Sequence, residues 1–260
     1  TPRRNRRQRQ MCIRDRGTVG SDFGPYAEWL DYVGINRRHV TELNETYTAQ
    51  AFITTDMDDN QITAFHPGAM DGSHFNSIAD TSGVTLGMVS PDGRQGMLDH
   101  AEQFVEAGIP FVFDPGQGLP LFGGEELKGF IEKATWVCVN DYESQLLQER
   151  TGMSPHEISE QVEALIVTRG GKGSYIYTEK ERIDIPAARA GELIDPTGCG
   201  DAYRGGLLYG LMNNLGWETT GRIAALMGAI KIEHHGTQNH SFDADEFRLR
   251  YRESFGSDLM

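Results

Sequence analysis

A short segment, DPTGCGD at residues 195–201, combines the residue types that anion chemistry requires. Gly198 and Gly200 allow the backbone to turn so that successive amide N–H groups point the same way, and a helix-like stretch follows at residues 202–212. Amides at the N-terminus of a helix form a pocket for an anion such as phosphate. An aspartate in that pocket would repel a phosphate that is merely bound. We therefore interpret Asp201 as a base that takes a proton from an attacking hydroxyl while the amides stabilise a transferring phosphoryl group.

Two familiar phosphate-binding motifs do not describe this segment. The P-loop pattern GxxxxGK[ST] requires a lysine followed by serine or threonine, which this segment lacks. The dinucleotide-binding pattern GxGxxG fails because Tyr203 stands where its third glycine would be. A simpler alternative stays open, in which the glycines form a tight turn and Asp201 only caps the helix.

The elements that must position this segment alternate between strand and helix patterns. Such alternation favours a parallel sheet covered on both faces, with chemistry beyond the carboxyl ends of its strands. Three of the expected strands end in polar or glycine-rich turns, at Asp114, Asn140 and Thr168. We expect strands at residues 84–89, 110–113, 136–139 and 164–167, hairpins at 47–65 and 174–185, and helices at 25–33, 96–107, 125–133, 142–150, 202–212, 220–234 and 243–254.

Composition narrows the class of protein further. A chain of 260 residues is long enough for one large α/β domain. Its three cysteines include no CxxC pair, which argues against a disulfide scaffold or a structural zinc site and suits a reducing cytoplasm. No apolar run is long enough for a membrane helix. The net charge of −14 argues against nucleic acid as a partner.

The first sixteen residues, TPRRNRRQRQMCIRDR, differ from the rest because they hold seven arginines and one aspartate. They lack the apolar stretch of a signal peptide and have no amphipathic period. We expect residues 1–16 to be a non-native or disordered tail and residues 17–260 to form the folded domain.

Residues 195–210, DPTGCGDAYRGGLLYG, resemble the carboxy-terminal signature of the ribokinase-like (PfkB) carbohydrate and nucleoside kinases. The resemblance extends over most of residues 17–247, including VGSDFGPY, the segment YTAQAFITTDMDDNQITAFHPGAM and GTQNH at 236–240. It is nearer to the bacterial adenosine kinase-like branch than to the fructokinases. The resemblance implies a three-layer α/β/α sandwich with a mainly parallel central sheet and a small β-hairpin lid at about residues 45–66.

The resemblance also implies roles for individual residues. Asp201 would be the catalytic base, and Gly198, Cys199 and Gly200 would form the anion hole. Glu143, with Asn140, matches an NxxE element that organises Mg²⁺ and phosphate through water. The implied ATP-binding residues are Asn140, Thr168, Arg169, Gly170, Gly173 and Gly236.

Two further sites follow from the same resemblance. Asp195 and Thr197, with the backbone near residues 236–238, match positions that hold a monovalent cation such as K⁺ in relatives. Phe52 and Phe65 lie in the implied lid, where they would pack either on a nucleoside or on the body of the protein. We expect the three histidines of this region to line an adenine pocket or the surface rather than bind a metal: His234, His235 and His240.

The chain also departs from the family pattern. The amino-terminal strand and the glycine-pair motif that binds the acceptor are not found before residue 17, so we expect the substrate-binding unit to be missing. Arg204 stands where many relatives carry a hydrophobic residue.

Together these features predict an ATP- and Mg²⁺-dependent kinase that phosphorylates a primary hydroxyl, with adenosine as the expected acceptor. A sugar kinase of the ribokinase or fructokinase type is the first alternative, and an inactive nucleotide-binding fragment is the second. The expected partners are a small nucleoside or sugar and a second copy in a homodimer, in the cytoplasm, without nucleic acid or membrane.

Overall fold

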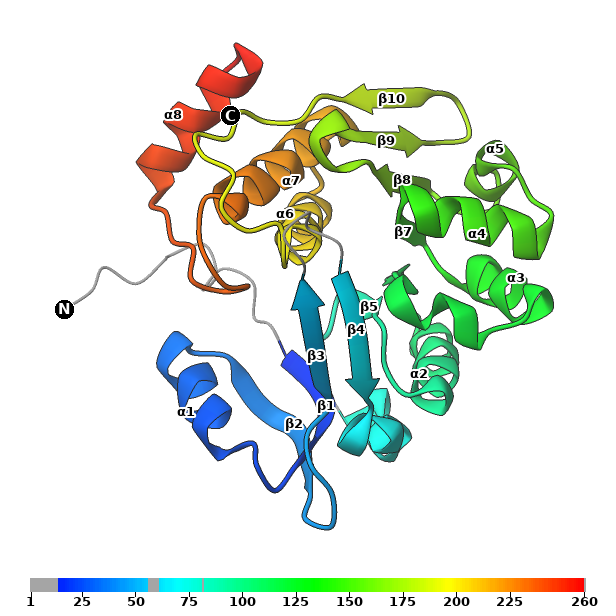
Figure 1. The fold of residues 1–260 in the computed structure, drawn as a ribbon. Helices are drawn as coiled ribbons and strands as arrows, with labels where there is room; N and C mark the ends of the chain where they lie inside the picture. The colour runs from blue at the N-terminus through cyan, green and yellow to red at the C-terminus, as the bar shows by residue number, and fades with distance from the viewer. Residues whose placement is uncertain (1–13, 56–60, 81, 260) are drawn as a thin grey trace. The chain divides into compact units, whose positions relative to one another are not determined.

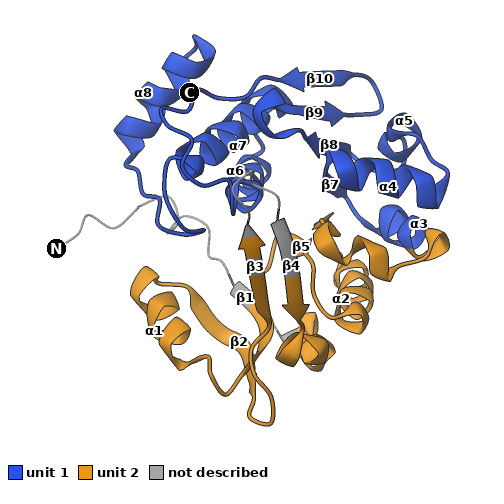
Figure 2. Ribbon diagram, viewed as in Figure 1, with its two compact units in different colours: residues 1–11, 127–260 blue, residues 12–126 orange. Residues whose placement is uncertain are grey.

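The computed structural model describes residues 14–55, 61–80 and 82–259, and the chain divides into two compact units (Figure 2). The N-terminal unit comprises residues 12–126, and the C-terminal unit comprises residues 127–260 together with residues 1–11. Most of the predicted tail, residues 1–13, lies outside the described residues. Arg14 to Arg16 begin strand β1 (Arg14–Gly20), so the predicted boundary after residue 16 falls inside a strand.

The C-terminal unit is built on a sheet whose strands follow the order β10-β9-β8-β7. Strands β7 and β8 are parallel to each other. Strand β9 is antiparallel to both β8 and β10. Helices α4 and α5 lie on one side of these strands, and α6 and α7 lie on the other (Figure 1). The elements are β7 (Trp136–Asn140), β8 (Ala164–Thr168), β9 (Ser174–Tyr177), β10 (Arg182–Ile185), α4 (Asp141–Thr151), α5 (Pro155–Ser159), α6 (Cys199–Met212), α7 (Trp217–Ile232) and α8 (Ala244–Phe255).

The core of this unit follows directly from its apolar runs. In β7 and β8 the first four residues of each strand are all buried, as expected for parallel strands covered on both faces. Helix α7 packs against α8 through a buried apolar cluster: Ile223, Leu226, Ile230, Phe247 and Tyr251. These contacts hold the C-terminal end of α7 in place, next to the segment that follows it.

The strands of the N-terminal unit form three pairs, β1 with β2, β3 with β4 and β5 with β6. Two pairs are parallel, each with an intervening helix, and the third is an antiparallel hairpin. Short 3₁₀ helices at Gly68–Phe75, Ile78–Asp80 and Gly116–Leu121 connect them, and another lies at Gly170–Lys172 in the C-terminal unit. The elements are β1, α1 (Gly24–Val33) and β2 (Asn36–Leu43); β3 (Gln50–Thr55) and β4 (Gln61–His66); and β5 (Gly87–Val89), α2 (Arg94–Glu106) and β6 (Phe111–Phe113), with α3 (Gly124–Lys133) following across the boundary between the units.

Most predicted elements are confirmed to within a few residues, including both hairpins. The exceptions are strands β1 and β2 and helix α5, which the sequence patterns do not indicate. Strand β2, NRRHVTEL, is polar and partly exposed, so its pairing with β1 and not its own hydrophobicity makes it a strand. Helix α5 has only five residues, too few for a helical period.

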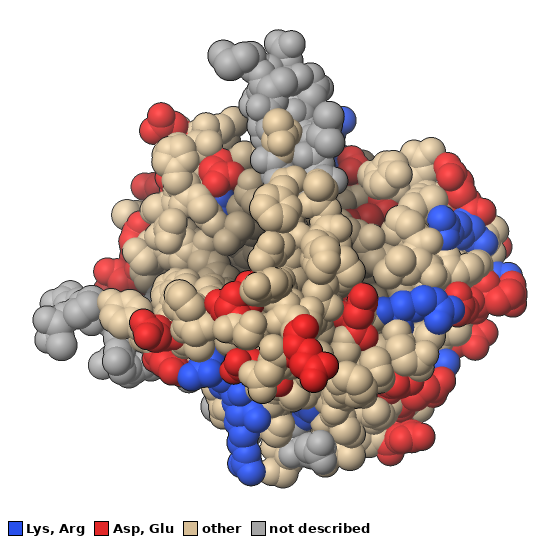
Figure 3. Space-filling view, turned by 60° about the horizontal axis from the view of Figure 1, so that its bottom comes forward, with Lys and Arg blue, Asp and Glu red and all other residues tan. Residues whose placement is uncertain are grey.

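The distribution of charged side chains on the surface agrees with the net charge of −14. On the face drawn in Figure 3, acidic side chains are spread widely and basic side chains lie singly or in small groups among them. Among the described residues, no helix is both long and apolar enough to cross a membrane.

Candidate active site

The turn before α6 has the geometry that the sequence predicts. Gly198 is the N-cap of the helix and has φ of 83°, a left-handed conformation that favours glycine. A Cβ at this position would also press on Thr237 at 3.1 Å. The amide of Cys199 donates to the carbonyl oxygen of Pro196 at 3.1 Å, whereas those of Gly198, Gly200 and Asp201 have no acceptor among the described residues. The helix start therefore retains unpaired N–H donors that can bind an anion.

Asp201 is the third residue of α6, and its side chain is exposed. Its carboxylate accepts no hydrogen bond from any residue that the structure describes, and the helix has no side-chain cap. The interpretation of Asp201 as a mere helix cap is therefore wrong. A carboxylate that its own helix leaves unbonded can accept a proton from a bound hydroxyl.

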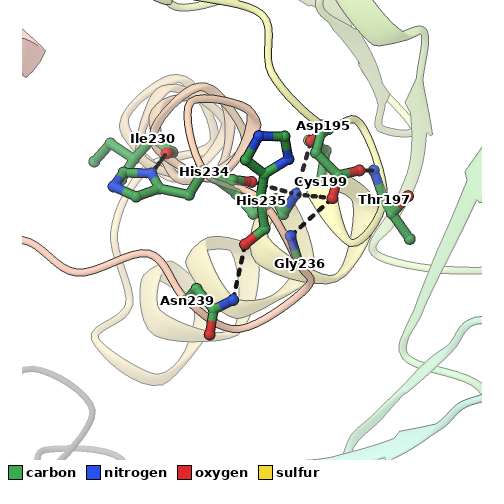
Figure 4. Close-up of polar contacts among 9 residues, drawn as sticks. Asp195, Thr197, Cys199, Ile230, His234, His235, Gly236 and Asn239 are labelled. Carbon is green, nitrogen blue, oxygen red and sulfur yellow. Dashed lines mark hydrogen bonds and ion pairs between the residues drawn. The ribbon is translucent and has the colours of Figure 1, made fainter.

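Asp195 fixes the start of the turn (Figure 4). One carboxylate oxygen accepts from the Thr197 amide at 2.9 Å, and the other accepts from the Gly236 amide at 2.8 Å. Hydrogen bonds from Thr197 and then Gly236 lower the pKa of Asp195 to about 2. The amides of Ile194 and Asp195 also donate to the carbonyl oxygen of Ile232. Asp195 thus joins the turn to the segment that follows α7.

Lys231, near the end of α7, lies beside the same turn. Its side chain is fully buried, and Nζ donates to the main-chain oxygens of Asp195 at 2.7 Å and His234 at 3.2 Å. Nζ also lies 3.8 Å from Oδ2 of Asp195. The family resemblance described in the sequence implies a monovalent cation at Asp195, Thr197 and residues 236–238. Here the main-chain oxygen of Asp195 already accepts from the Lys231 ammonium group at 2.7 Å. A cation added at the same oxygen would be repelled by this charge, so Asp195 fits a second cation poorly.

The three histidines of this region differ in burial and in hydrogen bonding. Nδ1 of His234 lies 2.9 Å from the carbonyl oxygen of Ile230, and His235 is exposed. His240 is half-buried, and burial lowers its pKa. Within the described part of the chain, no group of three or more His, Cys, Asp or Glu side chains could hold a metal ion.

Asn140 and Glu143 interact with each other rather than pointing freely into solvent. The Asn140 side chain accepts from the Glu143 amide at 2.7 Å, and the Glu143 carboxylate accepts from the Asn140 amide at 2.8 Å. This capping box starts α4 at the carboxyl end of β7. The second carboxylate oxygen of Glu143 is a hard ligand of the kind that Mg²⁺ accepts, so the residue fits contact through water better than a closed metal cage.

The glycine-rich turn after β8 lies at the same edge of the sheet. In the parallel pairing of β7 with β8, Asn140 stands directly opposite Thr168, so both residues end their strands side by side. Gly173 has φ of 83° and packs against the backbone of Ile185, whereas Gly170 is exposed with φ of 53°.

The guanidinium of Arg169 lies over the Tyr175 ring, 3.9 Å from its centroid, and donates to the Lys172 carbonyl oxygen. Arg169 thus braces the turn in this structure. Its predicted contact with phosphate stays a prediction.

Sequence reasoning missed two buried polar groups beside the turn. The Tyr203 hydroxyl lies 2.8 Å from Ser174 Oγ and links α6 to β9, and burial raises the pKa of Tyr203. Lys231 is the other. The signal that could have found it is a single lysine inside the apolar run LMGAIKI.

The predicted lid residues lie in the hairpin β3–β4 of the N-terminal unit, and both are exposed. In the register of the hairpin, Phe52 stands opposite Ala64 and Phe65 stands opposite Ala51. Residues that face each other across strands share a face, and neighbours along a strand alternate. The two phenylalanines therefore project from opposite faces. The two side chains would therefore not pack together on one nucleoside, and the packing of either on a nucleoside or on the body of the protein stays a prediction.

Comparison with known proteins extends these observations. The family described as "pfkB family carbohydrate kinase" matches residues 16–244. The nucleoside kinase of Methanocaldococcus jannaschii is 34% identical over 228 residues, which cover 85% of this chain and 74% of that protein.

Solved structures agree in fold. The structure of Burkholderia thailandensis nucleoside kinase in complex with inosine is 51% identical, with a TM-score of 0.92, and the match covers 94% of this chain and 81% of that one. The same enzyme in complex with ADP-inosine has a TM-score of 0.90, covering 94% of this chain and 77% of that one. These matches confirm the predicted ribokinase-like α/β fold, and the chain belongs to the pfkB family of carbohydrate kinases.

Proposed function

We propose that this chain transfers the γ-phosphoryl group of ATP to a primary hydroxyl of a nucleoside, with the 5′-hydroxyl of adenosine as the expected acceptor. The observation that carries the proposal is the exposed, unbonded carboxylate of Asp201 beside the unpaired amides at the start of α6. The similarity to a nucleoside kinase bound to inosine supports a nucleoside as the substrate class.

In the proposed reaction Asp201 accepts the proton of the acceptor hydroxyl while the hydroxyl oxygen attacks the γ-phosphorus of ATP. The bond from the γ-phosphorus to the bridging oxygen breaks, and ADP leaves. The amides of Gly198 and Gly200 donate to the phosphoryl oxygens, and the positive end of the α6 dipole favours their negative charge. Cys199 shapes the turn because its backbone N–H donates a hydrogen bond to the carbonyl oxygen of Pro196. Burial raises the pKa of the Cys199 thiol, so the thiol stays neutral and does not compete with Asp201 as a base.

The nucleotide would lie along the carboxyl ends of β7 and β8. Asn140 and Thr168 are adjacent there, and the turn at Arg169, Gly170 and Gly173 follows immediately. Gly236 contributes by holding Asp195 through its amide. Mg²⁺, when bound with ATP, supplies charge neutralisation on the phosphates, and Glu143 would reach it through water.

A direct test measures ADP release from Mg-ATP with adenosine, inosine, ribose or fructose as acceptor. Turnover with a nucleoside and none with a sugar supports the proposal, and the ratio of kcat/KM between adenosine and inosine tests the expected acceptor. Turnover with ribose or fructose alone would identify a sugar kinase instead. ATP binding without turnover on any acceptor would identify an inactive nucleotide-binding fragment.

The base assignment is tested by Asp201→Asn. We expect kcat to fall by about 100-fold to 10,000-fold, the range for loss of a general base, while ATP binding measured by calorimetry is retained. Asp245→Asn on α8 is the matched control, because the Asp245 side chain is 94% exposed and lies outside the proposed site. Equal turnover of Asp201→Asn and the parent protein would refute the role of Asp201.

A further inference from the structure

A fully buried lysine requires a physical explanation. Lys231 has no exposed side-chain surface, and its neighbours Ala229 and Ile230 in α7 are also buried. Placing an ammonium group in such a position is costly unless oxygen atoms replace its water. The cost is offset only where the charge has a specific set of partners.

The partners of Lys231 are all oxygens. An ammonium group has three donors and no acceptor. Two of its donors bond to the main-chain oxygens of Asp195 and His234, and the carboxylate of Asp195 lies 3.8 Å away. Carbonyl and carboxylate oxygens are also the ligands that a hard cation prefers.

These partners belong to the two segments that build the anion-binding turn. Asp195 begins the segment that leads to Gly198 and α6. His234 begins the turn that leads to Gly236, whose amide donates to the carboxylate of Asp195 (Figure 4). Thr237 follows, and a Cβ on Gly198 would lie 3.1 Å from it. Nζ of Lys231 therefore joins both segments through its hydrogen bonds to Asp195 and His234.

We propose that Lys231 is a positioning residue that serves the anion-binding turn as a covalently attached cation, so that the turn needs no added K⁺ or Na⁺. The proposal rests on the proposed function for its effect on phosphoryl transfer. Its effect on stability and on ATP binding is independent of which acceptor, if any, is phosphorylated.

The first experiment uses the unaltered protein in KCl, NaCl or tetramethylammonium chloride at equal ionic strength. We expect the melting temperature, the Kd for ATP and the kcat and KM of the kinase reaction to be the same in the three salts. A rise in melting temperature or a tighter Kd for ATP that is specific to K⁺ or Na⁺ would overturn the proposal. This result does not depend on any variant being able to fold.

The second experiment removes the charge. Lys231→Met keeps most of the side-chain volume, and we expect the Kd and KM for ATP to rise by about tenfold or more, as when a buried charged hydrogen-bond donor is lost. Lys231→Ala also leaves space, so K⁺ should restore its melting temperature and ATP affinity while tetramethylammonium does not. Lys180→Met is the control, because Lys180 is exposed in the turn between β9 and β10.

The outcomes separate this proposal from the proposed function. ATP affinity in Lys231→Met equal to that of the parent would overturn the role of Lys231 even if the parent is an active kinase. A parent without turnover on any acceptor would refute the proposed function, while the melting temperatures and ATP affinities would still decide the role of Lys231.

Discussion

At the scale of single residues, backbone conformation decides whether the loops around the site can exist. Gly173 closes the turn after β8 with φ of 83° and ψ of −142°, a combination that is essentially restricted to glycine. A Cβ there would overlap the carbonyl oxygen of Ile185. This glycine is therefore required by both strain and space, whereas the sequence motif alone does not distinguish it from its neighbours.

A comparison of Gly173 with Gly171 tests whether the turn after β8 requires glycine at position 173. Gly173→Ala should lower the free energy of unfolding by about 1–3 kcal/mol or more, since it adds strain and a clash. Gly171→Ala should change it little, because Gly171 is exposed and a Cβ there meets no atom within 4 Å. Urea denaturation of both variants measures the difference. Equal stability of the two would contradict the described conformation of the turn.

At the scale of elements, the close packing of α6 on α7 brings the anion-binding turn and Lys231 together. Gly206 faces the backbone of Ala224, and a Cβ on Gly206 would lie 2.6 Å from Cα of Ala224. One turn later, a Cβ on Gly210 would lie 2.5 Å from the side chain of Thr220. The small residues of α6, which the sequence analysis noted only as part of a family signature, thus set the distance between the two helices.

Adjacent glycines in α6 provide a matched pair. Gly206→Ala should destabilise the protein by about 1–3 kcal/mol, because it forces the helices apart in a packed interface. Gly205→Ala should stabilise it by about 0.5–1 kcal/mol, because no atom of the described residues lies within 4 Å of a Cβ there and alanine favours the helix. Thermal and urea unfolding give both values. Opposite signs are the expected result, and two losses of equal size would argue against this packing.

At the scale of the whole molecule, the two units divide the predicted site residues. All of the proposed anion-hole and nucleotide-binding residues belong to the C-terminal unit, whereas both lid phenylalanines belong to the N-terminal unit. In the C-terminal unit, a partly buried ion pair joins α8 to the end of α7. Arg250 of α8 donates twice, at 2.7 Å each, to Glu233 at the end of α7, which also accepts from the Gly191 amide at 2.6 Å.

This ion pair predicts how stability depends on pH. Burial alone would raise the pKa of Glu233, but the hydrogen bonds from Arg250 and Gly191 lower it below the usual 4.5. A lowered folded-state pKa means that the stabilisation is complete above pH about 4.5 and is lost as the pH falls through the folded-state value. Glu233→Gln should therefore be less stable than the parent by about 1.5–3 kcal/mol at neutral pH.

Urea unfolding between pH 7 and pH 3 checks this prediction. The stability difference between the parent and Glu233→Gln should stay constant down to pH about 4.5 and shrink only below it. A difference that disappears between pH 7 and pH 5 would show that another group controls it. Arg182 and Asp184 form an exposed ion pair, so Asp184→Asn is a control expected to change stability little.

The secondary structure could largely be predicted from the sequence because its signals are local. The apolar runs of β7 and β8 and the turn residues of the two hairpins are sufficient without any tertiary contact. Strand β2 could not be found in this way, because its polar residues become a strand only by pairing with β1, which lies earlier in the chain.

The features of the candidate site likewise divide into those that depend on neighbouring residues and those that depend on tertiary contacts. The sequence by itself determined the segment from Asp195 to Asp201, because glycine spacing, a following helix and one carboxylate are properties of neighbouring residues. Only the tertiary structure decided that Lys231 supplies a buried cation to that turn and that Phe52 and Phe65 face opposite ways. The apolar run around Lys231 could have indicated its burial, but its oxygen partners lie in segments that only packing brings together, and no local pattern of residue types encodes those contacts.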